Sequence, residues 1–358
     1  MADGSDPGLA PRGATTTAMR RFVTGIPKAE LHMHLEGCIE PETMFALAER
    51  NGLTLRWPSP DALRAAYDFA NLQEFLALYF EGCRVLVTRQ DFHDIARAYL
   101  ARAHQDGVQR AEMFLGPQSF TAVGVPLDAI LGGVFDAIDE ARAETGIDGA
   151  LLVSAHRHRS EADALALLDS LGPWLDRIAG IGMGGAEIGN PPSKFSTFFA
   201  ASRALGLRTT IHAGEEGPAD FVRQALDLLR VDRIDHGNAC LDDADLTRDL
   251  AARGIGLTVC PLSNVRLRVS PSLAEHPLRR MLGAGLNISV HSDDPPYFGG
   301  YVGDTILACQ GALGLTADHI ATLARNSFAA AFLPADRIAR EIAAVDAWCA
   351  EFDWQAEQ

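Results

Sequence analysis

The feature that most constrains the fold is a repeat of strand and helix signals along most of the chain. Eight segments are expected as strands: the segment around Leu31, Ala111–Gly116, Gly149–Ser154, Ile178–Glu187, Leu207–His212, Arg233–His236, Gly256–Cys260 and Asn287–His291. Strands separated by helices imply a parallel sheet with right-handed crossovers, and eight such repeats predict a (β/α)₈ barrel. A doubly wound open sheet is the alternative, but no Gly-x-Gly-x-x-Gly follows the first strand.

Helical signals fill the gaps between these strands and continue after the last one. The helices expected between strands are Gln90–Asp106, Leu127–Thr145, Glu161–Leu171, a helix capped by Ser193 and ending at Gly206, Pro218–Leu229, Asp242–Arg253 and Glu275–Ala284. Two C-terminal helices, Ala317–Phe332 and Arg337–Phe352, are expected to pack outside the barrel. Residues 1–20 lack the apolar core of a signal peptide and are expected to be a flexible tail, which leaves 21–358 as a single barrel domain.

The net charge limits the kinds of partner that are expected, and the cysteine pattern indicates the redox compartment. The formal net charge of −16 argues against a nucleic-acid or anionic membrane partner and disfavours a highly phosphorylated substrate. No apolar run is long enough to span a bilayer. The six cysteines are scattered without a Cys-x-x-Cys, so we expect reduced thiols in a cytoplasmic protein. A homo-oligomer is left open.

An insertion after the first strand carries apolar residues at helical spacing. Asn71 to Glu74 resembles a capping box, and the residues that follow it include Phe75 and Tyr79. These residues either pack on the core or fold over the strand ends as a lid. Phe75 is the candidate substrate contact on this segment.

The first strand carries two histidines two residues apart. His32, His34 and Glu36 alternate with apolar residues, so the two imidazoles share one face of the strand. Such a pair is either half of a metal site or two histidines on a solvated face.

Unusual polar residues at the ends of later strands favour the metal site. Barrels of this type place their chemistry at the C-terminal ends of the strands. The stretches found there are Gly184-Gly185-Ala186-Glu187, His212-Ala213-Gly214-Glu215, Asp235-His236-Gly237, Cys260-Pro261-Leu262-Ser263-Asn264 and His291-Ser292-Asp293-Asp294-Pro295. One site at the barrel mouth explains all of these stretches together.

The residue types in these stretches suit a catalytic zinc ion. His32, His34 and His212 supply three nitrogen ligands and Asp293 an oxygen, which leaves a position for water, whose pKa would fall to about 7. Glu215 follows His212 by three residues and can carry a proton to the reacting centre.

Other polar residues receive less specific predictions. His236 is assigned to the attacking water or the developing alkoxide. Asp294 either contacts substrate or caps a loop before a proline, and Glu187 is either a loop carboxylate with a direct role or a structural acid. Three further histidines in charged company are predicted to be surface residues: His156, His158 and His276.

Taken together, these motifs resemble the adenosine/adenine deaminase family of zinc amidohydrolases. The resemblance rests on His-Met-His-Leu-Glu-Gly, His-Ala-Gly-Glu, Ile-Asp-His-Gly, Cys-Pro-Leu-Ser-Asn and Ser-Asp-Asp-Pro, found in order between about Pro27 and Phe332. It implies a (β/α)₈ barrel with one zinc ion that hydrolyses the 6-amino group of a purine to ammonia and a 6-oxo product. The ligand set of cytidine-type deaminases, with Pro-Cys-x-x-Cys, is absent.

The resemblance also implies roles for individual residues. His32, His34, His212 and Asp293 correspond to the zinc ligands. Glu215 corresponds to the acid that protonates purine N1.

Four more positions carry implied roles. His236 and Asp293 correspond to the residues that orient and deprotonate the attacking water. Asp294 corresponds to the partner of N7, and Gly185 to the glycine whose N–H meets N3.

Two branches of the family differ in substrate. The residues after Gly214 and those from Phe298 to Tyr301 resemble the bacterial adenine deaminases, which act on the free base. Those enzymes carry Asp-Ser-Ser-Glu after strand four, whereas this chain has two glycines, Ala186 and Glu187 there. His291 also departs from the small or amide residue usual before Ser-Asp-Asp.

The substrate expected from these residues is a nucleoside. Glycines at 184 and 185 would remove polar contacts to the base and admit an N9 substituent, and Glu36 would bind a sugar hydroxyl. Free adenine is the alternative. A binuclear hydrolase would need a bridging lysine or acid after strand four, and Met183-Gly184-Gly185 offers none. A non-catalytic binding protein would be expected to have lost Glu215 or a ligand, and none is lost.

Overall fold

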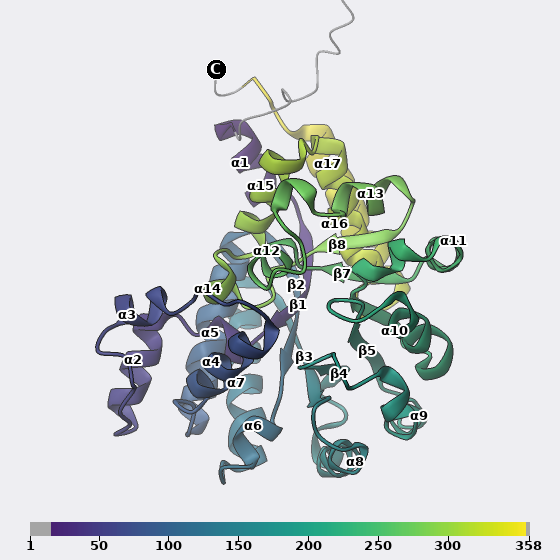
Figure 1. Ribbon diagram of the computed structural model, residues 1–358. Helices are drawn as coiled ribbons and strands as arrows, with labels where there is room; N and C mark the ends of the chain where they lie inside the picture. The colour runs from purple at the N-terminus through teal and green to yellow at the C-terminus, as the bar shows by residue number, and fades with distance from the viewer. Residues whose placement is uncertain (1–15, 356–358) are drawn as a thin grey trace, which may run out of the picture.

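An eight-stranded parallel barrel forms the centre of the computed structural model, which describes residues 16–355 (Figure 1). The strands follow one another in sequence order, and each is parallel to the next. They are β1 Lys28–His34, β2 Val108–Leu115, β3 Asp148–His156, β4 Ile178–Gly184, β5 Arg208–Ala213, β6 Arg233–His236, β7 Gly256–Val259 and β8 Asn287–Val290. All eight expected strands are present, and the predicted (β/α)₈ barrel is confirmed.

Helices surround the barrel and cover the outer face of the strands (Figure 1). They are α1 Thr17–Gly25, α2 Pro41–Arg50, α3 Pro60–Ala65, α4 Leu72–Cys83, α5 Arg89–Gln105, α6 Gln118–Thr121, α7 Leu127–Thr145, α8 Glu161–Ser170, α9 Ser196–Ala204, α10 Ala219–Arg223, α11 Ala244–Arg253, α12 Pro261–Arg266, α13 Leu278–Gly283, α14 Pro295–Phe298, α15 Val302–Leu313, α16 Ala317–Ala329 and α17 Ala335–Glu351. Because both faces of the strands are covered, almost every strand residue is buried.

The barrel closes through a single residue rather than a long ladder. Beyond the end of β8, the N–H of Asp293 donates to the carbonyl of His32 at 3.1 Å. The N–H of His34 donates to the carbonyl of Asp293 at 3.0 Å. The extension of the last strand therefore pairs with the first strand at the mouth of the barrel.

The two ends of the described chain lie together on one side of the barrel (Figure 1). The C-terminal helices are α16, which packs against β1 and β8, and α17, which packs on α16. The sequence analysis did not predict α1. Its Phe22 ring is buried, with ring centroids 5.1 Å from both Phe352 and Trp354. Residues 1–15 of the expected tail lie outside the described residues, and Thr17–Arg20 belong to α1.

Several boundaries differ from the expected ones. Strand β4 ends at Gly184 instead of Glu187, because Gly185 has φ +95°, outside the strand region. Strand β3 runs two residues further than expected, to His156. Ser193 lies in a 3₁₀ turn, and α9 begins only at Ser196. The segment expected to be one helix over 218–229 is α10 followed by a π-helical turn.

The structure bears on two of the composition arguments. All six cysteines are free thiols, and all but Cys349 are buried. Among residues 16–355, no helix is both long enough and apolar enough to cross a bilayer.

Candidate active site

Three strand ends bring four potential metal ligands to one point. His32 and His34 extend from β1 into the barrel, as the alternation predicted, with ring centroids 5.6 Å apart. His212 comes from β5, and Asp293 follows β8. The barrel closure described above fixes the backbone of Asp293 beside that of both β1 histidines.

The ligand atoms of these four residues lie close enough together to share one metal ion. His212 Nε2 lies 3.1 Å from His32 Nε2 and 3.2 Å from His34 Nε2. Asp293 Oδ1 lies 3.6 Å from His32 Nε2 and 3.4 Å from His34 Nε2. Ligand atoms that share a zinc ion through bonds of about 2.0–2.1 Å lie roughly 3–3.5 Å apart, and a further position can remain open for water. The donor set therefore fits one such ion.

Polar groups behind the histidines orient them. The Nδ1 atom of His32 lies 3.0 Å from Thr258 Oγ1, and this hydroxyl donates to Asp235 Oδ1 at 2.9 Å. The other oxygen of Asp235 lies 3.3 Å from Nδ1 of His212. Such contacts fix the ring orientation and leave Nε2 available for a metal ion. The sequence analysis did not predict this role for Asp235.

Burial affects the protonation of the two β1 histidines. Burial, together with the neighbouring imidazoles, lowers the pKa of His32 and that of His34 well below the usual 6.5. The neutral imidazole is the form that binds a metal ion.

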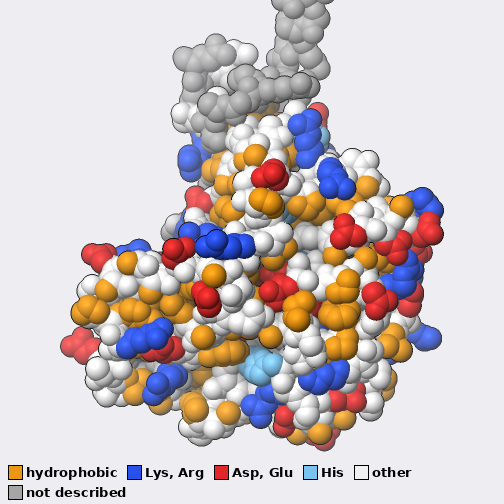
Figure 2. Space-filling view, viewed as in Figure 1, with side chains coloured by type: hydrophobic (Ala, Val, Ile, Leu, Met, Phe, Trp, Pro, Cys, Tyr) orange, Lys and Arg blue, Asp and Glu red, His pale blue; other side chains and the backbone are white. Residues whose placement is uncertain are grey.

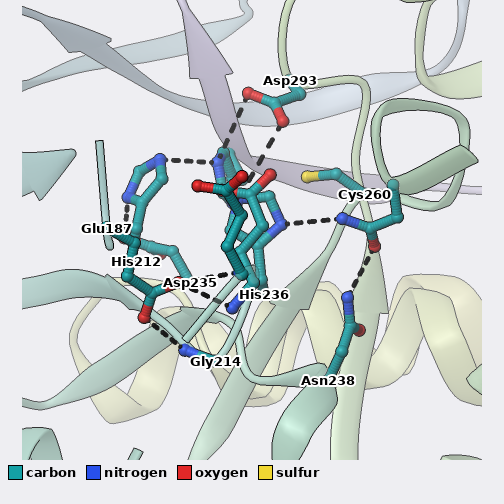
Figure 3. Close-up of polar contacts among 12 residues, drawn as sticks. Glu187, His212, Gly214, Asp235, His236, Asn238, Cys260 and Asp293 are labelled. Atoms are coloured by element: carbon teal, nitrogen blue, oxygen red, sulfur yellow. Dashed lines mark hydrogen bonds and ion pairs between the residues drawn. The ribbon is translucent and has the colours of Figure 1, made fainter. Parts of the chain in front are cut away.

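Glu215 and His236 lie beside the cluster, as the sequence analysis predicted. His236 Nε2 is 3.5 Å from Glu215 Oε2 and 4.0 Å from Asp293 Oδ2. Burial, followed by the charge of Asp293, raises the pKa of the Glu215 carboxyl well above its usual value. His236 extends from the end of β6 (Figure 3). The side-chain amide nitrogen of Asn264 lies 3.4 Å from the His236 Nδ1 atom. A carboxyl whose pKa is raised and an imidazole whose pKa is lowered by burial thus face the same space.

Two of these residues have strained backbones. His236 and Asp293 both have φ of +64°, in the left-handed region that non-glycine residues rarely adopt. Such positions cost about 1–3 kcal/mol each and occur mainly at functional sites. The strain is consistent with selection of these residues for chemistry.

A cavity of about 550 Å³ opens onto the cluster. One wall is formed by α4, through Leu72, Phe75, Leu76, Tyr79 and Phe80. Helix α4 therefore covers the strand ends, where the lid interpretation placed it. On the face shown in Figure 2, acidic and basic side chains are interspersed, and a histidine is exposed near the centre.

The remaining predicted substrate contacts also line this cavity: Glu36, Gly185 and Asp294. Glu36 Oε1 accepts a hydrogen bond from Gly116 N–H at 2.8 Å. Its Oε2 and Asp294 Oδ1 are buried and have no hydrogen-bond partner among the described residues. Burial raises the pKa of Glu36 to about 7. Two carboxyl oxygens are thus left available to a ligand.

Two histidines predicted to be on the surface are buried. His156 lines the cavity at the end of β3, and its Nε2 lies 2.8 Å from Ser119 Oγ. The expected strand ended two residues too early, so its alternation was not followed to this inward position. His276 is 3 % exposed and contacts Asn264 Oδ1 at 3.1 Å. Only His158 is exposed, as predicted.

The structural alternative for Glu187 matches the structure. Its carboxylate is fully buried outside the cavity wall and accepts four backbone N–H groups from residues 214–217. Figure 3 shows it pointing at Gly214. His291 is likewise structural: its Nδ1 accepts from Leu31 N–H at 3.1 Å, inside the barrel.

Comparison with known proteins supports the same family as the motifs. The family model for adenosine deaminase matches residues 27–348. An adenine deaminase of Rhodopseudomonas palustris is 59% identical over 326 residues, covering 91% of this chain and 94% of that protein. An adenine deaminase of Caulobacter vibrioides is 51% identical over 334 residues, covering 93% and 97%.

Solved structures agree with the curated relatives. The crystal structure of adenine deaminase from Arthrobacter aurescens is 46% identical with a TM-score of 0.89, covering 91% of this chain and 100% of that one. An amidohydrolase from Burkholderia ambifaria, solved with bound Zn, is 33% identical with a TM-score of 0.87 and covers 98% of both chains. Together with the site geometry, these matches show that the chain belongs to the adenosine deaminase family of purine aminohydrolases.

Proposed function

We propose that this chain is an adenine deaminase, which hydrolyses the 6-amino group of free adenine to give hypoxanthine and ammonia. The observation that carries the proposal is the set of relatives named adenine deaminase, which are 50–59% identical over most of the chain. The solved adenine deaminase at 46% identity supports the same substrate.

The nucleoside preference expected from Gly184, Gly185 and Ala186 is not supported. A Cβ on Gly184 would lie 3.3 Å from the ring of His212, so a side chain there would crowd a proposed metal ligand. Gly185 has φ +95°, which also favours glycine. Ala186 does not line the cavity. Backbone and packing constraints thus also favour glycine at positions 184 and 185, so the two glycines do not by themselves indicate an N9 substituent.

The cavity itself contains a feature that suits the free base. Adenine carries an N–H on its five-membered ring, and this N–H is absent from adenosine. Glu36 Oε2 and Asp294 Oδ1 are buried acceptors without a partner among the described residues. The two residues are neighbours, because Asp294 packs directly against Gly37. The ring N–H would satisfy Glu36 Oε2, whereas an N9-substituted base would leave that oxygen unpaired. Here Glu36 recognises the base and not a sugar.

We assign one zinc ion to His32, His34, His212 and Asp293. The 3.1–3.6 Å distances among their ligand atoms and the zinc-bound relative at 33% identity support the assignment. The ion supplies a Lewis acid that lowers the pKa of a water molecule to about 7.

The other site residues move protons and hold the base. Glu215, protonated because of its raised pKa, donates to ring N1 and so makes C6 electrophilic. Neutral His236 and the second oxygen of Asp293 orient the attacking water and accept its proton. Asp294 contacts N7, and the Gly185 N–H contacts N3. Phe75 packs against the base from α4.

A substrate panel tests the proposal. Adenine, 9-methyladenine and adenosine are compared by kcat/KM, and 9-methyladenine separates loss of the ring N–H from the bulk of a sugar. We expect adenine to exceed both by on the order of 10⁴-fold, the discrimination reached by sites built to bond a group. Glu36→Gln should narrow the gap between adenine and 9-methyladenine. Faster turnover of adenosine than of adenine would refute the free-base assignment.

A further inference from the structure

We propose that Glu187 and Arg157 are positioning residues, which form a buried clamp that fixes the loop 214–217 and thereby aims the Glu215 carboxyl into the cavity. The proposal rests on the proton-donor role given to Glu215 above. Neither residue lines the cavity, so neither contacts substrate.

The first half of the clamp is the carboxylate of Glu187. Its Oε1 accepts the N–H of Gly214 at 2.8 Å. Its Oε2 accepts the N–H groups of Glu215, Glu216 and Gly217 at 3.1, 2.9 and 2.9 Å. The Glu215 backbone is therefore held from both sides and at its own N–H. Hydrogen bonds to a carboxylate are stronger than neutral ones, and this carboxylate is fully buried.

In the part of the chain that the structure describes, no helix or strand supplies partners for the N–H groups of this loop. It lies between the end of β5 at Ala213 and the start of α10 at Ala219, so its N–H groups belong to neither element. Gly214 has φ +74°, and a Cβ on Gly217 would lie 2.6 Å from Glu187 Oε1. The two glycines thus allow four successive N–H groups to converge on one anion.

Arg157 provides the second half of the clamp. It is fully buried, and its guanidinium donates to the carbonyl of His212 at 2.5 Å and to that of Asn190 at 3.0 and 2.7 Å. The same guanidinium lies 4.0 Å from Glu187 Oε1. Arg157 therefore ties the Glu187 segment to the end of β5 and balances the buried charge of Glu187.

The clamp acts on the distance between Glu215 and the reacting ring. Glu215 is the only carboxyl among the four loop residues whose side chain reaches the cavity. Its backbone N–H is bonded to Glu187 while its carboxyl lies 3.5 Å from His236. A displacement of about 1 Å at a reacting group can cost roughly 10²-fold in rate. A loosened loop would therefore slow the proton transfer while leaving the binding contacts of the base in place.

A double-mutant cycle separates positioning from general stability. Glu187→Gln, Glu215→Gln and the double variant are assayed with adenine, alongside zinc content and Tm. We expect Glu187→Gln to keep its zinc and to lower kcat by roughly 10–10²-fold with KM changed less than about threefold. In the Glu215→Gln background the same substitution should lower kcat no further.

Asp91→Asn is the matched control. Asp91 is also fully buried, pairs with Arg50, and accepts backbone N–H groups at 2.9 and 2.7 Å, but it lies on α5 away from the cavity. The Asp91→Asn substitution should lower Tm without changing kcat. If Glu187→Gln does not fold, Arg157→Lys is taken through the same cycle.

Each result decides between the two proposals. The clamp is overturned if the folded Glu187→Gln protein has the wild-type kcat. It is also overturned if this substitution lowers kcat by the same factor in the wild-type and Glu215→Gln backgrounds. Either result leaves the proposed function intact. Full activity of Glu215→Gln alone overturns the proton-donor role, and with it the reason for positioning this residue.

Discussion

At the scale of single residues, Asp293 combines more tasks than any other residue of the site. Its backbone closes the barrel against β1, its carboxylate lies within 3.6 Å of two histidines, and its φ is +64°. Substitution of Asp293 would change the barrel closure, the contacts of the carboxylate and the backbone strain at once. His212, which lies in a regular strand and whose side chain is directed at the cluster, is the cleaner probe of metal binding.

We expect His212→Ala to lose most of its zinc, because three ligands remain where the proposed site has four. The loss should exceed the about 10–100-fold in affinity that follows removal of a ligand's hydrogen-bond partner. Metal analysis of purified protein measures it, with His104→Ala on the exposed end of α5 as the matched control. Full zinc retention, or two zinc ions per wild-type chain, would contradict the assigned site.

The site residues differ in how far the sequence could predict them. His32, His34, His212 and Asp293 stand in motifs at strand ends, and the barrel rule alone brings them together. Arg157 and Glu187 left no comparable signal, because their partners are backbone groups of residues 190 and 212–217. A contact between a side chain and a distant backbone N–H or carbonyl imposes no residue type on the second position, so the sequence does not record it.

At the scale of elements, the alternation of strands and helices predicted the barrel because each βα unit repeats the same burial pattern. Strand ends were the weak point. The expected β4 included Glu187, since a run of glycines gives no sign of where φ becomes positive. Helix α1 was missed because its three buried residues stand among arginines and threonines beside a Gly- and Pro-rich segment.

Helix α4 offers a test of the cavity wall. The Phe75 ring packs against Phe298 at 4.8 Å and Tyr297 at 5.4 Å between ring centroids, and it also lines the cavity. Phe75→Leu should raise KM for adenine severalfold with little change in kcat, and should cost about 1–3 kcal/mol of stability.

The matched control for α4 is Phe92→Leu. Phe92 is fully buried on α5 and packs edge-on against Phe120 at 4.9 Å, away from the cavity. The Phe92→Leu substitution should reduce stability about as much as Phe75→Leu does and leave KM for adenine unchanged. If steady-state kinetics give equal KM values for the two variants, Phe75 contributes to the hydrophobic core and not to the binding of adenine.

The segment between α12 and α13 should sense acid through His276. Burial lowers its pKa from 6.5 to about 4, and it accepts a hydrogen bond from Leu278 N–H at 3.1 Å. Between pH 6.5 and about 4 the unfolded chain binds a proton at His276 that the folded chain does not, so stability falls as pH falls. The stability that depends on neutral His276 is fully present above pH 6.5.

Thermal unfolding across this range measures the effect. His276→Gln removes the titration while keeping a polar side chain, so its Tm should change less between pH 6.5 and 4 than that of the wild type. A variant whose acid sensitivity equals that of the wild type would show that other groups carry the whole effect.

At the scale of the whole molecule, the proposed zinc ligands come from β1, β5 and the extension of β8. An ion bound to all of them would hold separate parts of the barrel together and would bind only the folded state. We therefore expect a chelator to lower the Tm of the wild type, and added zinc to restore it.

His212→Ala serves as the control for chelation, since a protein that has already lost its zinc should show no Tm change. Calorimetry with parallel metal analysis makes the comparison. An unchanged Tm in wild-type protein shown to be zinc-free would mean that the ion contributes to catalysis but not to the stability of the barrel.

The closure of the barrel by Asp293 has a consequence for biosynthesis. A ribosome makes the chain from its N-terminus, so His32 and His34 emerge early, whereas Asp293 emerges after more than four-fifths of the residues have been joined. Before then the nascent chain can present the three imidazoles, including that of His212, but not the fourth ligand or the strand pairing that holds it. Under the proposed ligand set, complete metal loading is a late event in synthesis, and a polypeptide truncated before β8 would carry three of the four ligands without its closing residue.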